Sequence, residues 1–115
     1  MEAKLKKQGE ISIVMIQGHL NIEETQSFRD VCVKHFTGQK VIFNMEKANF
    51  VGSTGLQPFL ETIQHITQDN ANGLKIVGVK SEFRRIFQNM DAQNLEIHDT
   101  EAGAIASFNK IVNII

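Results

Sequence analysis

Short β-branched apolar runs alternate along the chain with segments whose apolar residues recur every three or four positions. The apolar runs predict strands that are buried on both faces. They are Glu10 to Gln17, Lys40 to Met45, Leu74 to Val79 and Leu95 to His98. Ala3 to Lys6 predicts a short edge strand beside the first run, and the charges of Lys4, Lys6 and Lys7 are expected to protect that edge.

The periodic segments predict four amphipathic helices. Asn21 is expected to cap the first, whose apolar stripe ends near Gly38 and consists of Phe28, Val31, Cys32, His35 and Phe36. The second has Leu56, Phe59, Leu60, Ile63 and Ile66. The third spans Ser81 to Met90, with Ser81 as its cap and Phe83, Ile86, Phe87 and Met90 as its stripe. Thr100 is expected to cap the fourth, with Ile105, Phe108, Val112 and Ile115.

Strands that alternate with helices of this length predict an α/β fold with a mixed, mostly parallel sheet, an N-terminal antiparallel hairpin and about four helices. No repeat or linker divides the sequence, so one domain is expected over residues 1–115. Sites in such open sheets gather at the loops that leave the carboxyl ends of the strands. The loops of interest are therefore Gly18 to Asn21, Glu46 to Gly55 and Lys80 to Ser81.

Composition narrows the function. Twelve basic and thirteen acidic residues give a net charge of -1, and Trp and Tyr are absent, which argues against nucleic-acid binding. Cys32 is the only cysteine, so no internal disulfide forms and a reducing, cytoplasmic location is expected. Its position on an apolar stripe favours a packed, inert thiol. The apolar run from Ile13 to Ile16 is too short to insert in a membrane.

Motifs for catalysis are missing. The sequence has no phosphate-binding or dinucleotide-binding glycine loop, no HExxH and no GxSxG, so neither an enzyme nor a cofactor is predicted. The four histidines, at positions 19, 35, 65 and 98, have spacings that match no metal site. Arg84 and Arg85 could bind phosphate at a helix start, although a solvated helix face explains them equally well.

Residues Asn49 to Leu56 (NFVGSTGL) stand out because two hydroxyls lie where a strand leads into a helix. Backbone N–H groups there have no internal partner, and Gly52 and Gly55 let another protein approach closely. A phosphate on Ser53 would add about -1.5 to -2 charges. Alternatively, Ser53 or Thr54 simply caps the helix, a contribution of about 1 kcal/mol. Pro58 predicts that the regular helix begins near Gly55, with Ser53 just outside it.

The run Val41 to Leu56 resembles the central signature of STAS domains, the family of anti-sigma factor antagonists and of the cytoplasmic domains of sulphate transporters. The matching residues are Phe50, Val51, Ser53, Thr54, Gly55 and Leu56. Gly52 departs from the pattern, since the family usually has an acidic residue there. The resemblance extends over nearly the whole chain.

This resemblance implies a regulatory protein-binding module. In anti-sigma factor antagonists the serine aligned with Ser53, with Thr54 as the alternative, is phosphorylated by a GHKL-type kinase that is also an anti-sigma factor. The unmodified antagonist sequesters that kinase and frees the sigma factor. The phosphorylated form releases the kinase until a phosphatase restores the unmodified form. The implied partner surface comprises Asn21, Val51, Gly52, Ser53, Thr54, Gly55 and Leu56.

A second interpretation remains open. The chain could be a non-switching STAS subunit of a larger assembly, such as a lipid-transport ATPase complex or a stress-signalling scaffold. The glycine at position 52 favours this alternative, because the residue that usually precedes the modified serine is missing.

Overall fold

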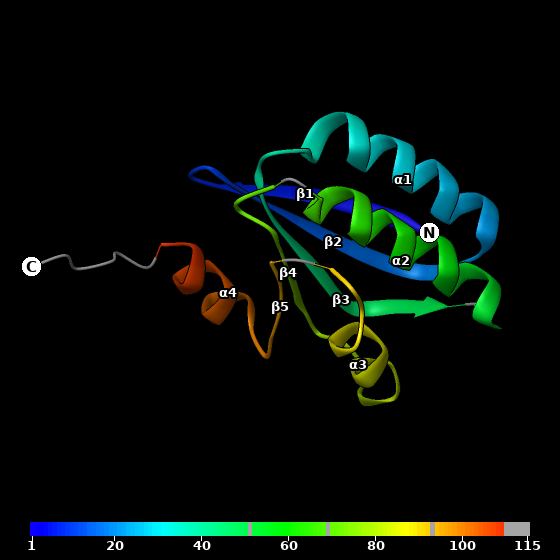
Figure 1. Ribbon diagram of the computed structural model, residues 1–115. Coiled ribbons are helices and arrows are strands. Elements are labelled where there is room, and N and C mark those ends of the chain that lie inside the picture. The colour runs from blue at the N-terminus through cyan, green and yellow to red at the C-terminus, as the bar shows by residue number, and fades with distance from the viewer. Residues whose placement is uncertain (51, 69, 93, 110–115) are drawn as a thin grey trace, which may run out of the picture.

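The computed structural model describes residues 1–50, 52–68, 70–92 and 94–109. Within these ranges, five strands form one sheet in the order β1-β2-β3-β4-β5, and four helices accompany it (Figure 1). The strands are β1 (Glu2–Gln8), β2 (Ile11–Leu20), β3 (Lys40–Phe50), β4 (Leu74–Val77) and β5 (Leu95–His98). The helices are α1 (Ile22–Phe36), α2 (Gly52–Thr67), α3 (Ser81–Gln88) and α4 (Glu101–Phe108).

The pairing directions confirm the predicted fold class. β1 is antiparallel to β2, and every other neighbouring pair is parallel. A strand that returns in parallel needs a crossover connection, and α1, α2 and α3 supply these crossovers. The mixed α/β sheet, its N-terminal antiparallel hairpin and the four helices are therefore as predicted.

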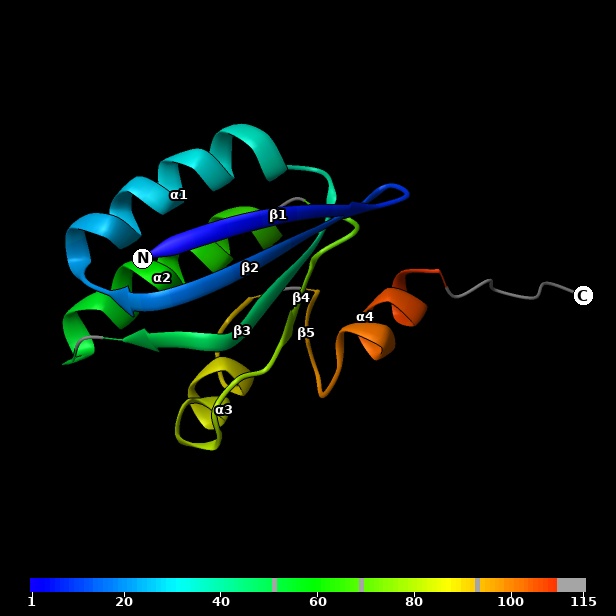
Figure 2. The same cartoon turned by 180° about the vertical axis from the view of Figure 1, so that it is seen from behind.

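Helices cover both faces of the sheet, as the two views show together (Figures 1 and 2). Alternate residues of β2 divide between two cores: Val14 and Ile16 pack with α1 and α2, whereas Ile11 and Ile13 pack with α4. This explains why the apolar strand runs have no polar alternation.

The larger core is organised around Phe59, a fully buried residue of α2. Its ring lies 6.3 Å from Phe28 of α1, 6.0 Å from Phe43 of β3 and 6.1 Å from Phe87 of α3, measured between centroids. Aromatic pairs at these separations each contribute about 0.5–1.5 kcal/mol beyond the burial of their area. One side chain thus connects three helices to the centre of the sheet.

Two predicted core residues of α1 are not buried. Phe28, Cys32 and Phe36 are buried as expected, but Val31 is 51% exposed and His35 is exposed. The three buried residues, spaced four apart, face the core. Val31 and His35 instead face β1, which does not close over them.

The helix starts were predicted with mixed success. Asn21 Oδ1 accepts a hydrogen bond from the Glu24 N–H at 2.9 Å, and Thr100 Oγ1 accepts one from the Gly103 N–H at 3.0 Å, which confirms both caps. The cap predicted at Ser81 is wrong, because α3 already includes this residue and follows Lys80. α3 also ends at Gln88, two residues early, and Ile86 is exposed on it.

β3 is five residues longer than predicted, and a β-bulge explains the difference. Met15 of β2 pairs with Asn44, whereas Gln17 pairs with Lys47, so β3 has one extra residue between these pairs. Asn44 Oδ1 accepts a hydrogen bond from the Glu46 N–H at 3.0 Å, across the bulge. The strand pairs onward after the bulge, to Phe50.

We expect Gly73→Ala to destabilise the fold strongly. Gly73 has a φ of 68°, and a Cβ there would lie 2.0 Å from the carbonyl oxygen of Asn94. Gly38, with a φ of 78° and no atom near its Cβ position, is the matched control. Gly38→Ala should cost about 1 kcal/mol for the left-handed backbone alone, and Gly73→Ala at least about 3 kcal/mol, measured by urea unfolding. Equal losses would contradict the close approach at Gly73.

Candidate functional site

The candidate site lies where β2 and β3 project beyond the rest of the sheet. These two strands pair as far as Leu20 and Phe50, whereas β3 pairs with β4 only over Ile42–Asn44. α1 begins at Ile22 and α2 at Gly52, each within two residues of a paired strand end. The amino ends of both helices therefore lie at the tip of this two-stranded projection (Figure 1).

Sequence reasoning grouped Asn21 with the segment around Ser53, and the strand register brings the two segments together. Asn21 directly follows Leu20, which pairs with Phe50. Leu56 packs against the main core and is partly buried. Val51 and the side chains of Gly52, Ser53, Thr54 and Gly55 lie outside the described residues.

The start of α2 differs from the prediction. The helix begins at Gly52, so Ser53 lies in its first turn and not outside it. Most of the predicted loop from Glu46 to Gly55 belongs to the longer β3 and to this helix. Pro58 was expected near the helix start, but it is the seventh residue of α2 and lies inside it. Its missing N–H removes the helical hydrogen bond to the carbonyl of Thr54.

The amino end of α2 is electrostatically unlike the other helix starts among the described residues. α1 has Glu23 and Glu24 in its first turn, α3 has Glu82 and α4 has Glu101, whereas α2 has no acidic residue there. The first N–H groups of a helix carry partial positive charge and lack helical partners. No carboxylate in the first turn of α2 offsets this charge.

Phe50 fixes the end of β3 that leads into α2. Its ring makes edge contacts with Phe59 of α2 and Phe83 of α3, each at a centroid distance of 5.3 Å. The neighbouring Asn49 lies on the opposite face of the strand, and its Oδ1 accepts a hydrogen bond from Lys80 Nζ. The end of β3 is thus held by contacts on both of its sides.

Sequence reasoning missed Ile22 as part of this surface. It is the first residue of α1, follows the cap Asn21, and is 45% exposed. A signal was available, because Ile22 does not share the four-residue spacing of Phe28, Cys32 and Phe36. An apolar residue out of phase with the buried stripe is expected on the surface.

Comparison with protein families identifies the fold. The family model described as STAS domain matches residues 2–104. The chain belongs to the STAS domain family. A comparison with curated proteins gave no match.

Solved structures resemble this STAS domain over most of its length. The anti-sigma factor antagonist SpoIIAA in its unphosphorylated form is 19% identical, with a TM-score of 0.64, over 96% of this chain and 100% of its own. Bacillus SpoIIAA in the phosphorylated form is 18% identical, with a TM-score of 0.62, over 92% and 98%. An anti-sigma factor antagonist from Mycobacterium paratuberculosis is 15% identical, with a TM-score of 0.70, over 95% and 94%. At these identities the likeness establishes a shared fold.

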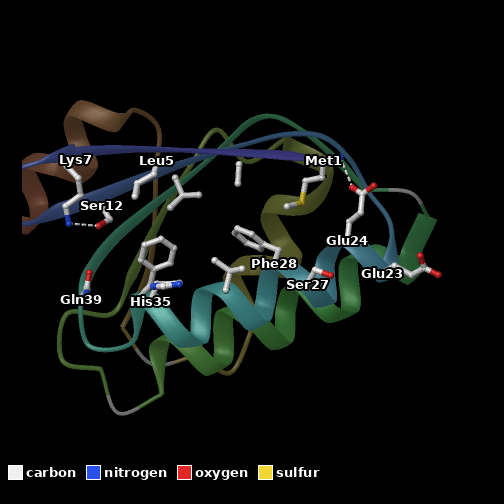
Figure 3. A pocket seen from close by; sticks show the side chains of 14 residues that line it. Met1, Leu5, Lys7, Ser12, Glu23, Glu24, Ser27, Phe28, His35 and Gln39 are labelled. Carbon is white, nitrogen blue, oxygen red and sulfur yellow. Dashed lines mark hydrogen bonds and ion pairs between the residues drawn. The ribbon is translucent and has the colours of Figure 1, made fainter.

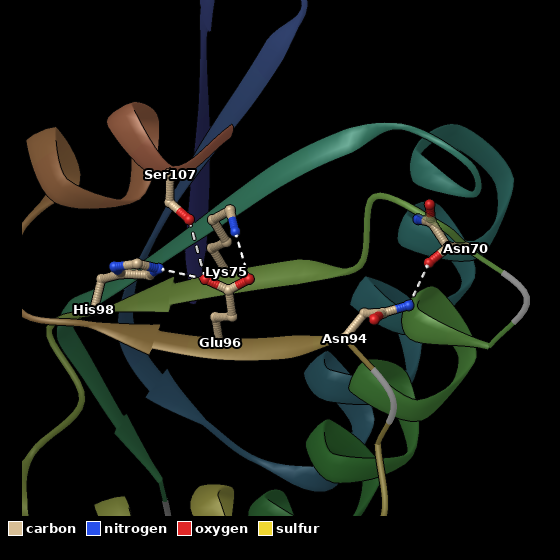
Figure 4. Close-up of polar contacts among 6 residues, drawn as sticks. All are labelled: Asn70, Lys75, Asn94, Glu96, His98 and Ser107. Atoms are coloured by element: carbon tan, nitrogen blue, oxygen red, sulfur yellow. Dashed lines mark hydrogen bonds and ion pairs between the residues drawn. The ribbon is translucent and has the colours of Figure 1, made fainter. Parts of the chain in front are cut away.

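A second polar cluster of the STAS domain joins β4, β5 and α4 (Figure 4). The Glu96 carboxylate forms an ion pair with Lys75 Nζ at 2.9 Å and accepts a hydrogen bond from the Ser107 hydroxyl at 3.1 Å. It also lies 3.0 Å from His98 Nε2. Lys75 is buried and also lies 4.4 Å from the centre of the Phe108 ring. Burying an ammonium group is unfavourable without a partner, so this cluster neutralises Lys75 and holds α4 on the sheet.

The structure also shows the surroundings of Cys32 and Arg84, two further residues that the sequence singled out. Cys32 is fully buried, and burial raises the pKa of its thiol to about 12, which agrees with the prediction of an inert side chain. Arg84 Nη2 contacts Asp99 Oδ1 at 3.1 Å, on an exposed helix face. Over the described ranges, no cluster of three potential metal-ligating side chains occurs. No described helix is both long and apolar enough to cross a bilayer.

We expect Glu96→Gln to destabilise the protein in a pH-dependent way. The hydrogen bond from Lys75 lowers the pKa of Glu96 to about 2 from an ordinary value of 4.5. A lowered pKa in the folded state stabilises the fold above the unfolded-state pKa, and this contribution disappears as the pH falls toward 2. At pH 7 the variant should lose at least about 1 kcal/mol, since Glu96 is half exposed but its partner Lys75 is buried.

The measurement is urea unfolding between pH 2 and pH 7. The difference between wild type and Glu96→Gln should shrink as the pH falls from 4.5 to 2. Asp91→Asn, which changes an exposed carboxylate after α3, is the control and should have little effect. A difference that is constant across this range would contradict the assignment of Glu96 as the partner of Lys75.

Proposed function

We propose that this STAS domain is an anti-sigma factor antagonist switched by phosphorylation of Ser53. Its partner is a GHKL-type kinase that also acts as the anti-sigma factor, and a phosphatase reverses the modification. The domain is then a protein-binding module and a kinase substrate, and not itself an enzyme. The observation that carries the proposal is the start of α2, where Ser53 lies in a first turn with no acidic residue. Thr54, the next residue, is the alternative acceptor.

The helix start suits a phosphate on thermodynamic grounds. A negative charge close to the first amides of a helix is stabilised by about 0.3–1 kcal/mol. The modification therefore leaves α2 folded. SpoIIAA has this fold in both its unphosphorylated and its phosphorylated form, which supports the same expectation here. The switch must then act on binding to a partner and not on folding.

The surroundings of Ser53 suit a protein interface. The exposed Ile22 and the capping Asn21 lie at the neighbouring helix start. In the unmodified protein the exposed Ile22 lies beside the first turn of α2, whose leading N–H groups have no helical partner. A doubly charged phosphate in the middle of such an interface brings desolvation and repulsion. A penalty of about 3 kcal/mol weakens binding more than a hundredfold.

Gly52 supports a second candidate function. The family usually has an acidic residue at this position, and any help that its carboxylate gives in orienting the hydroxyl or engaging the kinase is missing here. In this alternative the domain is a non-switching subunit of a lipid-transport ATPase complex or a stress-signalling scaffold. The same surface would bind its partner whether or not a phosphate is present.

Phosphomimicry distinguishes the two functions. We expect Ser53→Asp to lose kinase binding more than a hundredfold, while Ser53→Ala and wild type bind alike. Ser81→Asp is the matched control, because it adds the same charge at the start of α3. The measurement is a lysate pull-down with all four proteins, partner identification by mass, and titration of the recovered kinase.

Phosphate transfer completes the test. The recovered kinase and ATP should add one phosphate to wild type and none to Ser53→Ala. If Thr54 is the acceptor instead, Thr54→Ala abolishes the phosphorylation. Equal binding of Ser53→Ala and Ser53→Asp would refute the switch. Recovery of a transporter or scaffold component by all variants would establish the second candidate.

A further inference from the structure

An open groove lies between β1 and α1, on the opposite side of α1 from α2 (Figure 3). Its volume is about 940 Å³, at the upper end of the roughly 300–1,000 Å³ of ligand sites. Leu5 of β1 and Val31 of α1 line it and are 58% and 51% exposed, and the ring of Phe28 lies at its inner side. Two apolar side chains are thus exposed in one cavity.

The groove exists because β1 and α1 do not pack on each other. Every residue of β1 from Glu2 to Gln8 is exposed, although β1 pairs with β2 along its whole length. α1 packs on the core through Phe28, Cys32 and Phe36, which turns its neighbouring face toward β1. This is the reason why Val31 was predicted to be buried and is not.

The two ends of the groove have opposite charge. Lys7, Ser12 and His35 lie at one end, and Glu23 and Glu24 at the other (Figure 3). The Met1 amino group also lies at the second end, 2.7 Å from Glu24 Oε2, which leaves the charge of Glu23 in excess there. The ammonium of Lys7 donates a hydrogen bond to the buried Ser12 hydroxyl at 2.9 Å. Among the described residues, no carboxylate lies within 4.0 Å of this ammonium. One end therefore offers an unneutralised cation above an apolar floor.

We propose that this groove binds a free long-chain carboxylic acid. The carboxylate lies on Lys7, and the hydrocarbon chain runs past Leu5 and Val31 toward the other end. There Glu24 is paired with the Met1 amino group, and the remaining charge of Glu23 disfavours the head group, which sets the direction. The six residue steps from Met1 to Lys7 extend about 20 Å at the strand rise, which accommodates a straight chain of the length of myristate. A carboxylate supplies the negative charge that Lys7 lacks, and the chain covers the exposed apolar surface.

A second copy of the chain is a poorer occupant. Docking through the free edge of β1 would pair two copies of this strand. In antiparallel pairing about Leu5, Lys4 of each copy opposes Lys6 of the other. Like charges directly opposite each other destabilise a sheet. The groove shares no residue with the start of α2, so this proposal stands or falls independently of the proposed function.

The test is titration of the full chain with myristate, laurate and decanoate below their micelle concentrations, followed by calorimetry and amide NMR shifts. Each removal of two methylenes should weaken binding about tenfold. Lys7→Gln should weaken the binding of laurate about tenfold. It should leave unchanged the binding of dodecanol, which has the same chain but no carboxylate.

Two valines of α1 form a matched pair of variants. Val31→Glu puts a carboxylate into the groove and should weaken laurate binding at least tenfold. Val33, which is 41% exposed beside Lys34 and His65 on the far side of α1, gives the control Val33→Glu, which should bind like wild type. Thermal unfolding checks that both variants fold.

Several results would overturn the proposal. They are no binding of myristate or laurate by wild type, an affinity indifferent to chain length, or equal binding by Val31→Glu and wild type. Wild-type dimers in sedimentation that Val31→Glu dissociates would assign the groove to a second copy. Binding to anionic phospholipid vesicles without binding of free acids would assign it to a membrane surface, and capture of a protein helix that laurate does not displace would assign it to a protein.

Discussion

One extra residue in β3 determines on which face of the sheet Phe50, the residue that leads into α2, is packed. Before the bulge, the odd-numbered residues Val41, Phe43 and Met45 face the core beneath α1 and α2. After it, the even-numbered Ala48 and Phe50 face the same core. Side chains alternate strictly along a strand, so without the bulge Phe50 would point to the opposite face. α2 would then start on the wrong side of the sheet.

The hydrogen bonds of Asn44 hold this arrangement. Its Oδ1 bonds the backbone at Glu46, and its Nδ2 donates to Glu101 Oε2 at 2.5 Å, in the first turn of α4. Asn44 is itself buried, so both of its polar groups need partners and the surrounding geometry is specified. The bulge that orients α2 is therefore tied to the helix on the other face of the sheet.

The fold was largely predictable, because the β-branched runs and the aromatic and aliphatic stripes report burial directly. β5 has the predicted bounds, and β2 and β3 were recognised by their apolar first halves. The second half of β3 was missed because the bulge changes the phase of the pattern and only Ala48 is buried there. Burial of Val31 was wrongly predicted, since a sequence shows the apolar face of a helix but not whether a strand covers it.

The grouping of Asn21 with the start of α2 could be predicted, because parallel strands bring their carboxyl ends to one edge. The exact first residue of α2 could not, since it depends on how far β3 pairs with β2.

Pro58 creates a point in α2 at which the helix bends more easily. The Pro58 carbonyl accepts a hydrogen bond from the buried Thr62 hydroxyl at 2.9 Å, and Phe59 and Ile63 seat the following turns in the core. Because Pro58 has no N–H, one backbone hydrogen bond between the residues before it and this rigid part of the helix is missing. Bending the leading turn therefore costs less free energy than in an uninterrupted helix. The leading turn of α2 can thus change its angle to the sheet while the aromatic centre of the domain stays packed.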